Sequence, residues 1–156
     1  MNKKLLAVAA VLIVVVAAVA IFVTTRGTAQ ENSWGDPSTD PQKLMIPRWF
    51  LSSLTHNGQP VELGDAQITL QFTEDNKANG SAGCNDFFAD YEVANKGKLT
   101  FGQAGSTMMY CDNYMQQETA YLDALSQVSQ FKTEQGKLIL SSADGQTTMT
   151  FAMPPK

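Results

Sequence analysis

The 156-residue sequence is poor in the side chains that most enzymes use for catalysis and metal binding, since it contains one histidine and two cysteines. A structural metal site normally takes three or four protein ligands, so His56, Cys84 and Cys111 are too few for one. His56 lies in the turn-like sequence Thr-His-Asn-Gly, and no GxSxG motif supplies a serine for it to activate. We therefore expect no metal, no cofactor and no catalytic residues, and we predict that the protein is not an enzyme.

Basic residues and phosphate-binding motifs are scarce as well. Without Lys3, Lys4 and Arg26, eight basic residues remain against fifteen acidic ones, a net charge of −7. No basic patch is left that could neutralise the phosphates of a nucleic acid. Gly80 and Gly83 form neither a GxGxxG motif nor a P-loop, which excludes the common dinucleotide and phosphate loops. We expect no nucleic acid among the partners.

Charged and strongly polar residues are absent from Leu5–Val23, a run of 19 residues. As a helix this run is about 28 Å long, close to the roughly 30 Å hydrocarbon core of a bilayer. Lys3 and Lys4 precede it and favour a cytoplasmic N-terminus. We predict that residues 1–23 are a signal anchor that holds the chain in the inner membrane by a single pass, with the C-terminal domain on the periplasmic side. The alternative is a signal that is cleaved near Ala29 and releases the domain into the periplasm.

The next segment lacks any apolar period. Residues 24–47 are rich in Thr, Ser, Pro, Gly, Asp and Gln, and such a segment cannot bury enough apolar surface to order itself. We predict a flexible tether over residues 24–47, whose ends lie roughly 27 Å apart if it behaves as a coil. The folded domain is predicted to cover residues 48–156.

The folded part shows the alternation of apolar and polar residues that is typical of β-strands. Gln67–Thr73 alternates throughout, which predicts a half-buried strand. Further strands are predicted at Trp49–Leu54, Lys98–Phe101, Lys137–Leu140 and Thr147–Phe151. Glycine-containing turns separate these runs, at Asn57-Gly58, Lys96-Gly97, Gln135-Gly136 and Asp144-Gly145. These turns are typical of β-hairpins and predict antiparallel strands.

One segment, Asn113–Ser129, changes to a helical period. Its apolar residues at helical spacing are Met115, Leu122, Leu125 and Val128. Asp112 or Asn113 suits the N-cap, and Glu118 lies elsewhere on the helical wheel. The predicted fold class is α+β and mainly antiparallel β: a meander sheet or opened barrel of about seven strands, covered by one helix and preceded by the N-terminal transmembrane helix.

The two cysteines have four possible roles. A reactive thiol would need a base, which only His56 could supply, or a helix N-terminus close to Cys111. A metal site lacks ligands, and two buried thiols need no partner. Export to an oxidising compartment, together with a total of two cysteines, favours a disulfide between Cys84 and Cys111. The sequence does not show whether their Cα atoms come within roughly 6 Å, so the alternatives remain open at this point.

The chain contains an ordered set of motifs: RWFLSSL, ITLQF, GSAGCNDFFADY, KLTFGQAGSTMMYC, ETAYLDAL and GKLILSSADGQTTMTF. In this order they resemble the META domain, the family of the heat-shock protein HslJ, over about residues 48–152. The matching positions are Trp49, Leu51, Gly83, Cys84, Asn85, Phe87, Tyr91, Thr107, Met109, Cys111, Glu118 and Leu125. The resemblance implies a small exported domain linked to envelope stress and antibiotic tolerance, with no established enzymatic reaction. The chain departs from HslJ at its start, where an apolar anchor replaces the lipoprotein cysteine.

The glycine-rich motif suits a structural role. Gly80 and Gly83 permit a bulge or a close backbone approach within a strand. Asn85 can bond to local backbone groups, and Phe87 and Tyr91 can both enter the core from one strand face. The functional alternative is that this motif lines a ligand groove.

Two function classes follow. The leading hypothesis is a non-enzymatic envelope protein, a stress-linked module that binds an unknown envelope protein or small ligand outside the inner membrane. The second is an inhibitor or ligand-binding domain that captures a peptide or a small hydrophobic molecule, and a thiol oxidoreductase ranks third. A large apolar cavity between the helix and the sheet would favour the second hypothesis, whereas a solid core would favour the first.

Overall fold

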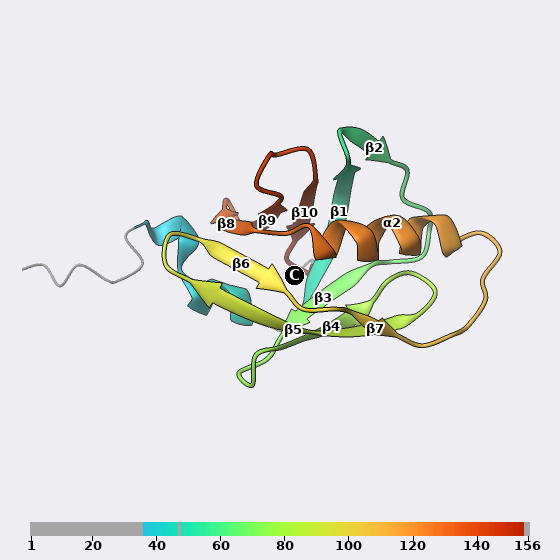
Figure 1. Cartoon of the computed structure of the whole chain (residues 1–156), viewed down its shortest axis with the longest axis horizontal. Helices are drawn as coiled ribbons and strands as arrows, with labels where there is room; N and C mark the ends of the chain where they lie inside the picture. Colours follow the sequence, from blue (N-terminus) through green and yellow to red (C-terminus); the bar gives the residue numbers. More distant parts are fainter. Residues whose placement is uncertain (1–35, 47, 155–156) are drawn as a thin grey trace, which may run out of the picture. The chain divides into compact units, whose positions relative to one another are not determined.

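The computed structural model describes residues 36–46 and 48–154 (Figure 1). The predicted anchor, residues 5–23, and the cleavage site near Ala29 lie outside these residues. Among the described residues, no helix has the length and apolar character needed to cross a membrane. The described helices are the 3-10 helices η1 (Pro37–Thr39) and η2 (Pro41–Met45) and the α-helix α2 (Met115–Ser126). The strands are β1 (Trp49–His56), β2 (Gln59–Val61), β3 (Thr69–Phe72), β4 (Lys77–Ser81), β5 (Asp86–Ala94), β6 (Lys98–Phe101), β7 (Gly105–Ser106), β8 (Gln130–Glu134), β9 (Lys137–Ser141) and β10 (Thr148–Ala152).

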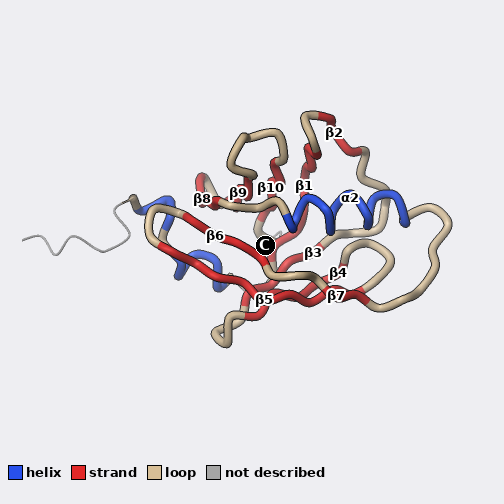
Figure 2. The backbone as a smooth tube through the Cα atoms, viewed as in Figure 1, coloured by secondary structure: helices blue, strands red, loops and turns tan. Residues whose placement is uncertain are grey.

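Eight of these strands form a closed antiparallel barrel (Figure 2). Around the ring the order is β1, β3, β4, β5, β6, β8, β9 and β10, and β10 pairs with β1 to close it. The closing pair sets Leu51 opposite Phe151 and Leu54 opposite Met149. Beside the ring, β2 pairs with β1 and β7 pairs with β5.

The mainly antiparallel β class with one helix is confirmed, but the predicted meander sheet or opened barrel of about seven strands is wrong. The barrel is closed and has eight strands. Hairpin turns reveal which consecutive strands pair, whereas closure depends on the pairing of β1 with β10. Ser52 and Thr150, which are hydrogen-bonded across this pair, lie 98 positions apart in the chain. No local pattern reports such a contact.

Local sequence accounts for the strands and the tight turns between them. In β5, Phe87, Ala89 and Tyr91 are buried while the residues between them are exposed, as the alternating pattern requires. The predicted turn at Asn57 and Gly58 has positive φ at both residues, 50° and 76°. This is the conformation of a two-residue hairpin loop, and it explains the Asn-Gly pair.

Helix α2 crosses one mouth of the barrel. It contacts β1 and β6, which are opposite each other in the ring, so the helix spans the opening between them. In Figure 1 it lies between the β1–β2 hairpin and the strands β3 to β7. Its Tyr121 is fully buried and meets Phe87 of β5 edge to face, with ring centroids 5.4 Å apart. The helix therefore completes the core.

The predicted apolar stripe of this helix is partly wrong. Met115 and Leu122 are only half-buried, and the buried helical residues are Gln117, Glu118, Tyr121, Ala124 and Leu125. Two polar residues face inward because the barrel supplies them with hydrogen-bond partners, which the sequence does not reveal. The helix begins at Met115 after Tyr114, without the side-chain cap that was predicted at Asp112 or Asn113.

The last part of the predicted tether belongs to the folded domain. Residues 36–46 form η1 and η2, and Leu44 is fully buried in the core. The carbonyl of Leu44 accepts a hydrogen bond from the Trp49 indole N–H at 3.1 Å. On the other side, the Thr133 hydroxyl of β8 donates to the Ser38 carbonyl at 3.0 Å. The prediction failed here because one buried leucine among polar residues produces no recurring apolar pattern in the sequence.

Candidate functional site

Asn85 lies at the centre of a buried polar network that joins three separate segments. Its side-chain oxygen accepts from the Met109 N–H and the Thr107 hydroxyl, both at 2.7 Å. Its side-chain nitrogen donates to the Met109 carbonyl at 3.0 Å and to the Glu118 carboxylate at 2.8 Å. Asn85 is only 2 % exposed, and its amide makes the four hydrogen bonds that such a group can make.

Glu118 ties this network to the first turn of α2. The side chain is 5 % exposed, and its two carboxylate oxygens accept from the backbone N–H and the side-chain amide of Asn85, each at 2.8 Å. A carboxylate buried without such partners would be strongly destabilising. Its place at the helix N-terminus is also favoured by the helix dipole. The helical wheel had placed Glu118 off the buried face, and the family motif was the signal that singled it out.

Gln117 and Gly83 interlock beside this network. Gln117 accepts from the Gly64 N–H at 2.6 Å and donates to the Ala66 carbonyl at 3.2 Å. Gly83 has φ of 111°, and a Cβ atom there would lie 2.8 Å from the Gln117 side-chain nitrogen. The conformation therefore requires glycine at position 83, and a Cβ atom there would also displace the Gln117 amide from its hydrogen bonds.

Cys84 and Cys111 form a disulfide, with their Cα atoms 5.9 Å apart. The pairing that the sequence favoured is thus present, and neither thiol is a free nucleophile while the bond is intact. The disulfide joins the segment before β5 to the segment before α2. Asn85 bonds to Thr107 and Met109, and the disulfide holds Cys111. Residues 107–111 are therefore held by two separate groups.

The other predicted motif residues lie in the core. Trp49 is buried beside Leu44, as described above, and Phe87 packs on Tyr121. Tyr91 meets Phe72 edge to face and donates its hydroxyl to the Thr73 carbonyl at 3.0 Å. Burial raises the pKa of Tyr91 above its ordinary value. The structure thus divides the motif residues between the core and the Asn85 network.

The network supports a surface that sequence reasoning missed. Met108 is 98 % exposed, Tyr110 78 %, Phe88 64 % and Met109 57 %. We refer to Met108, Met109 and Tyr110, which are consecutive in the chain, as the apolar tip. One signal pointed to the tip, because Met-Met-Tyr follows no strand or helix period. Phe88 lies opposite Gly105 on the outer face of β5 and is a separate exposed aromatic residue.

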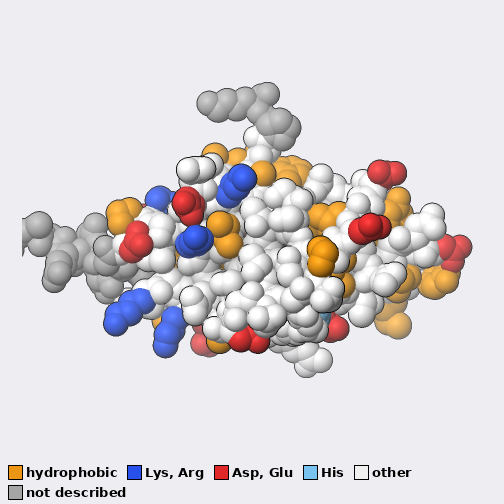
Figure 3. All heavy atoms as spheres, turned by 90° about the horizontal axis from the view of Figure 1, so that it is seen from above, with side chains coloured by type: hydrophobic (Ala, Val, Ile, Leu, Met, Phe, Trp, Pro, Cys, Tyr) orange, Lys and Arg blue, Asp and Glu red, His pale blue; other side chains and the backbone are white. Residues whose placement is uncertain are grey.

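The apolar tip lies in an acidic environment. Asp112 is exposed and follows the tip in the sequence. Asp86 is exposed as well; its backbone carbonyl accepts from the Thr107 N–H, and its backbone N–H donates to the Thr107 hydroxyl. In Figure 3, hydrophobic and acidic side chains lie together at the right-hand end, whereas Lys and Arg side chains gather toward the opposite end. An apolar surface with negative rims therefore occupies one end of the domain.

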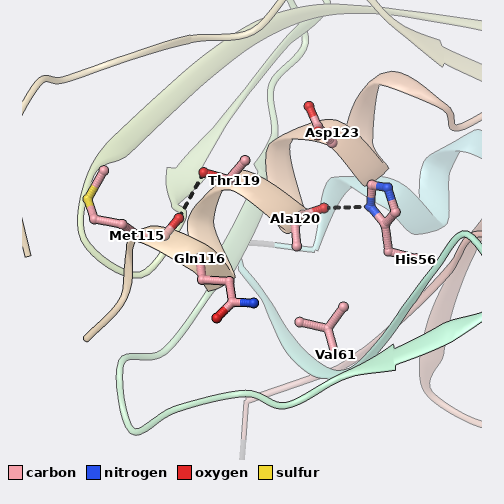
Figure 4. Close-up of a pocket in the computed structure, with 7 residues that line it drawn as sticks. All are labelled: His56, Val61, Met115, Gln116, Thr119, Ala120 and Asp123. Carbon is pink, nitrogen blue, oxygen red and sulfur yellow. Dashed lines mark hydrogen bonds between the residues drawn. The ribbon is translucent and has the colours of Figure 1, made fainter. Parts of the chain in front are cut away.

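A second candidate site is a pocket of about 540 Å³ between α2 and the β1–β2 hairpin (Figure 4). Its lining is formed by His56, Val61, Met115, Gln116, Thr119, Ala120 and Asp123. The ring of His56 contacts the Ala120 carbonyl, with its Nδ1 atom 3.1 Å away. Because a carbonyl only accepts, Nδ1 carries the proton, and Nε2 is left as an acceptor in the neutral ring.

The family model of the META domain matches residues 42–154. The chain belongs to the META domain family. The match begins at residue 42, in agreement with the ordered η2 segment. No curated protein matches the chain.

Solved structures share the fold of this META domain. A protein from Burkholderia xenovorans, studied by NMR, is 27 % identical over 84 % of this chain and 99 % of its own, with a TM-score of 0.62. A DUF4847 family protein from Bacteroides vulgatus is 12 % identical over 72 % of this chain and 96 % of its own, with a TM-score of 0.56. The second likeness concerns the fold alone.

The pocket of this META domain continues along α2 into a second compartment of about 530 Å³. The two compartments share Val61, Gln116 and Ala120. The second adds Glu62 and Asn113, so it is the more polar of the two. We refer to both compartments together as the α2 groove. Among the described residues, no three His, Cys, Asp or Glu side chains lie together as metal ligands would.

Proposed function

We propose that this META domain is a non-enzymatic interaction module of the cell envelope, linked to stress and antibiotic tolerance as the resemblance to HslJ implies. The observation that carries the proposal is the apolar tip. Exposed clusters of large apolar side chains on a folded domain mark interaction surfaces. In this domain a buried network and a disulfide hold the cluster in place.

The tip suits a protein partner. Tyr and Met are enriched in the cores of protein interfaces, and Tyr110 and Met108 are the most exposed residues of the tip. Because Met109 is bonded to Asn85 through both its N–H and its carbonyl, little backbone conformational entropy is lost when the tip binds. The carboxylates of Asp86 and Asp112 favour a partner with an apolar pocket and a basic rim.

The chemistry of the motif supports binding rather than catalysis. Both oxygens of Glu118 accept hydrogen bonds from Asn85, and Cys84 is joined to Cys111. The polar groups of the motif are thus engaged with one another and position the tip.

A disulfide also supports export, because such bonds persist in oxidising compartments. We propose that residues 5–23 anchor the chain in the inner membrane by a single pass and place the domain in the periplasm. The alternative is a secreted domain released by cleavage near Ala29.

A second candidate function is the capture of a peptide or a small hydrophobic molecule. The barrel interior is packed with large side chains such as Leu70, Phe87 and Met149, so capture inside the barrel is disfavoured. The α2 groove on the outside favours this function, because volumes of roughly 300–1,000 Å³ are typical of ligand sites.

In-cell photo-crosslinking tests the interaction proposal. A benzoylphenylalanine at position 108 of the full chain should give a discrete crosslinked protein band, which weakens strongly when Tyr110 is replaced by Ser. The matched control carries the same photo-reactive residue at exposed Ala143, in the β9–β10 loop. Equal crosslinking from positions 108 and 143, or no effect of Tyr110→Ser, would exclude the tip as the interaction surface.

A further inference from the structure

The α2 groove has a charge pattern that selects a ligand class. Asp123 lines the rim of the first compartment, with its carboxylate turned away from Val61 in Figure 4, and Glu62 lines the second; both are exposed. Neither compartment is lined by Lys or Arg, and His56 is the remaining titratable side chain of the lining. A cationic ligand therefore meets two carboxylates, whereas an anionic ligand meets repulsion at both ends of the groove.

Of the three residues that line both compartments, two are apolar and one, Gln116, is polar. Val61 on β2 and Ala120 on α2 line both compartments and pack partly against the core. In Figure 4 the side chains of Val61, Gln116 and Ala120 point into the space between the hairpin and the helix. Because Ala120 carries only a methyl group, the helix leaves room for an apolar side chain of a ligand.

The length of the groove fits a short extended segment. Its helical wall runs from Met115 to Asp123, and Asn113 lies two residues before the helix. The nine helical residues from Met115 to Asp123 span about 12 Å, which an extended chain covers in four or five residues at about 3.4 Å each. The first compartment is broadly open to solvent, so a peptide can enter it directly.

We propose that the α2 groove binds an extended peptide segment of a partner protein, with apolar side chains at its centre and a basic side chain at each end. The central side chains contact Val61 and Ala120, and the basic ones approach Glu62 and Asp123. Pro60 in β2 lacks a backbone donor, so side chains carry the recognition instead of strand addition. This proposal rests on the second candidate function and names its ligand.

The test uses the full chain in phosphatidylcholine nanodiscs and two fluorescent peptides, Lys-Leu-Val-Leu-Lys and Glu-Leu-Val-Leu-Glu, measured by fluorescence anisotropy. The lysine peptide should bind at least tenfold more tightly, and this preference should shrink in 0.5 M salt because the charges are exposed. Equal affinity for the two peptides would overturn the proposal. Binding of dodecylamine without binding of the lysine peptide would also overturn it, by assigning the groove to small amphipathic amines.

Variants locate the binding site. The double change Glu62→Gln with Asp123→Asn should weaken binding of the lysine peptide about fivefold, as expected for two exposed ion pairs. Ala120→Leu fills the groove and should weaken binding at least tenfold. The matched controls are Glu92→Gln and Ala143→Leu, both at exposed positions outside the groove, and they should bind like the wild type. Wild-type affinity in both groove variants, with unchanged thermal unfolding, would place the peptide elsewhere.

The groove and the tip can be tested separately. Met108→Ser with Tyr110→Ser should leave peptide affinity unchanged, and Ala120→Leu should leave crosslinking at position 108 unchanged. Loss of peptide binding in the tip variant would overturn the groove proposal, because it would place the peptide on the tip. If position 108 gives no crosslink in a protein that still binds the lysine peptide, this result would count only against the interaction role of the tip.

Discussion

The two sides of this barrel are specified in different ways. The strands β8, β9 and β10 follow one another through short turns, with Leu138, Leu140 and Phe151 buried at alternate positions. The side that contains the β4–β5 connection, residues 107–111 and the start of α2 depends on buried polar contacts around Asn85. Apolar alternation is sufficient to build a wall of the barrel. Holding an exposed apolar loop in one conformation requires specific hydrogen bonds and a disulfide.

The largest expected effect comes from breaking the polar side at its centre. Asn85→Ala removes the partners of both Met109 backbone groups and leaves the buried Glu118 carboxylate with one donor. We expect the free energy of unfolding to fall by about 3–5 kcal/mol. Chemical denaturation measures this loss. The control Asn79→Ala, at an exposed position on β4, should change stability by less than about 0.5 kcal/mol. A similarly small effect of Asn85→Ala would show that the network is dispensable.

Removing the disulfide tests how much the covalent link contributes to the stability of the side around Asn85. The change Cys84→Ala with Cys111→Ala should lower the free energy of unfolding by about 3.5 kcal/mol, because a loop bounded by residues 27 positions apart is no longer closed. Denaturation with and without reductant checks this. Reductant should destabilise the wild type by a similar amount and leave the double variant unchanged. If reductant has no effect on the wild type, the cysteines are not joined in solution.

The stability of the barrel should depend on Leu44, although this residue precedes the predicted start of the domain at residue 48. Leu44→Ala removes a fully buried side chain and should cost about 3 kcal/mol. Thermal unfolding of the variant, compared with the exposed neighbour change Gln42→Ala, measures this effect. Equal stability of the two variants would restore residues 36–46 to the tether.

The smallest expected effects come from two buried tyrosines and differ in sign. The Tyr121 hydroxyl is buried without a hydrogen-bond partner among the described residues, so Tyr121→Phe should stabilise the protein by about 1 kcal/mol. Tyr91→Phe loses the bond to Thr73 and should destabilise it by about the same amount. Denaturation at pH 7 compares the two variants, and destabilisation by Tyr121→Phe would reveal a partner for its hydroxyl.

Tyr121 also predicts an alkaline effect. Burial raises the pKa of this phenol in the folded state, so folding favours its protonated form. Stability is therefore fully present below the ordinary tyrosine pKa of about 10 and falls as the pH rises above it. Unfolding measured between pH 8 and 11 should show a shallower loss for Tyr121→Phe than for the wild type.

Much of the fold could be predicted because it is encoded locally. Alternation located β3, β6 and β10, and Asn57-Gly58 located a hairpin turn. The helix was located within three residues at each end. The cysteine count favoured the disulfide, and the motif resemblance singled out Asn85 and Glu118 before their contact was known. The direction in which Gln117 and Glu118 face could not be predicted, because an amphipathic pattern counts both as outward-facing.

The sequence by itself determined β1, β3, β6, β9 and β10, the hairpin turns, the helix and the family of this protein, because each depends on neighbouring residues or on an ordered motif. The tertiary structure decided the closure of β1 on β10, the burial of Leu44, and the meeting of Asn85 with Glu118. It also decided which large apolar side chains are exposed. Phe88, Met108 and Tyr110 are of residue types usually found in a core, yet they lie at the surface. The physical reason is that burial depends on what the rest of the chain brings alongside a residue, and a local period carries no record of contacts made across the barrel.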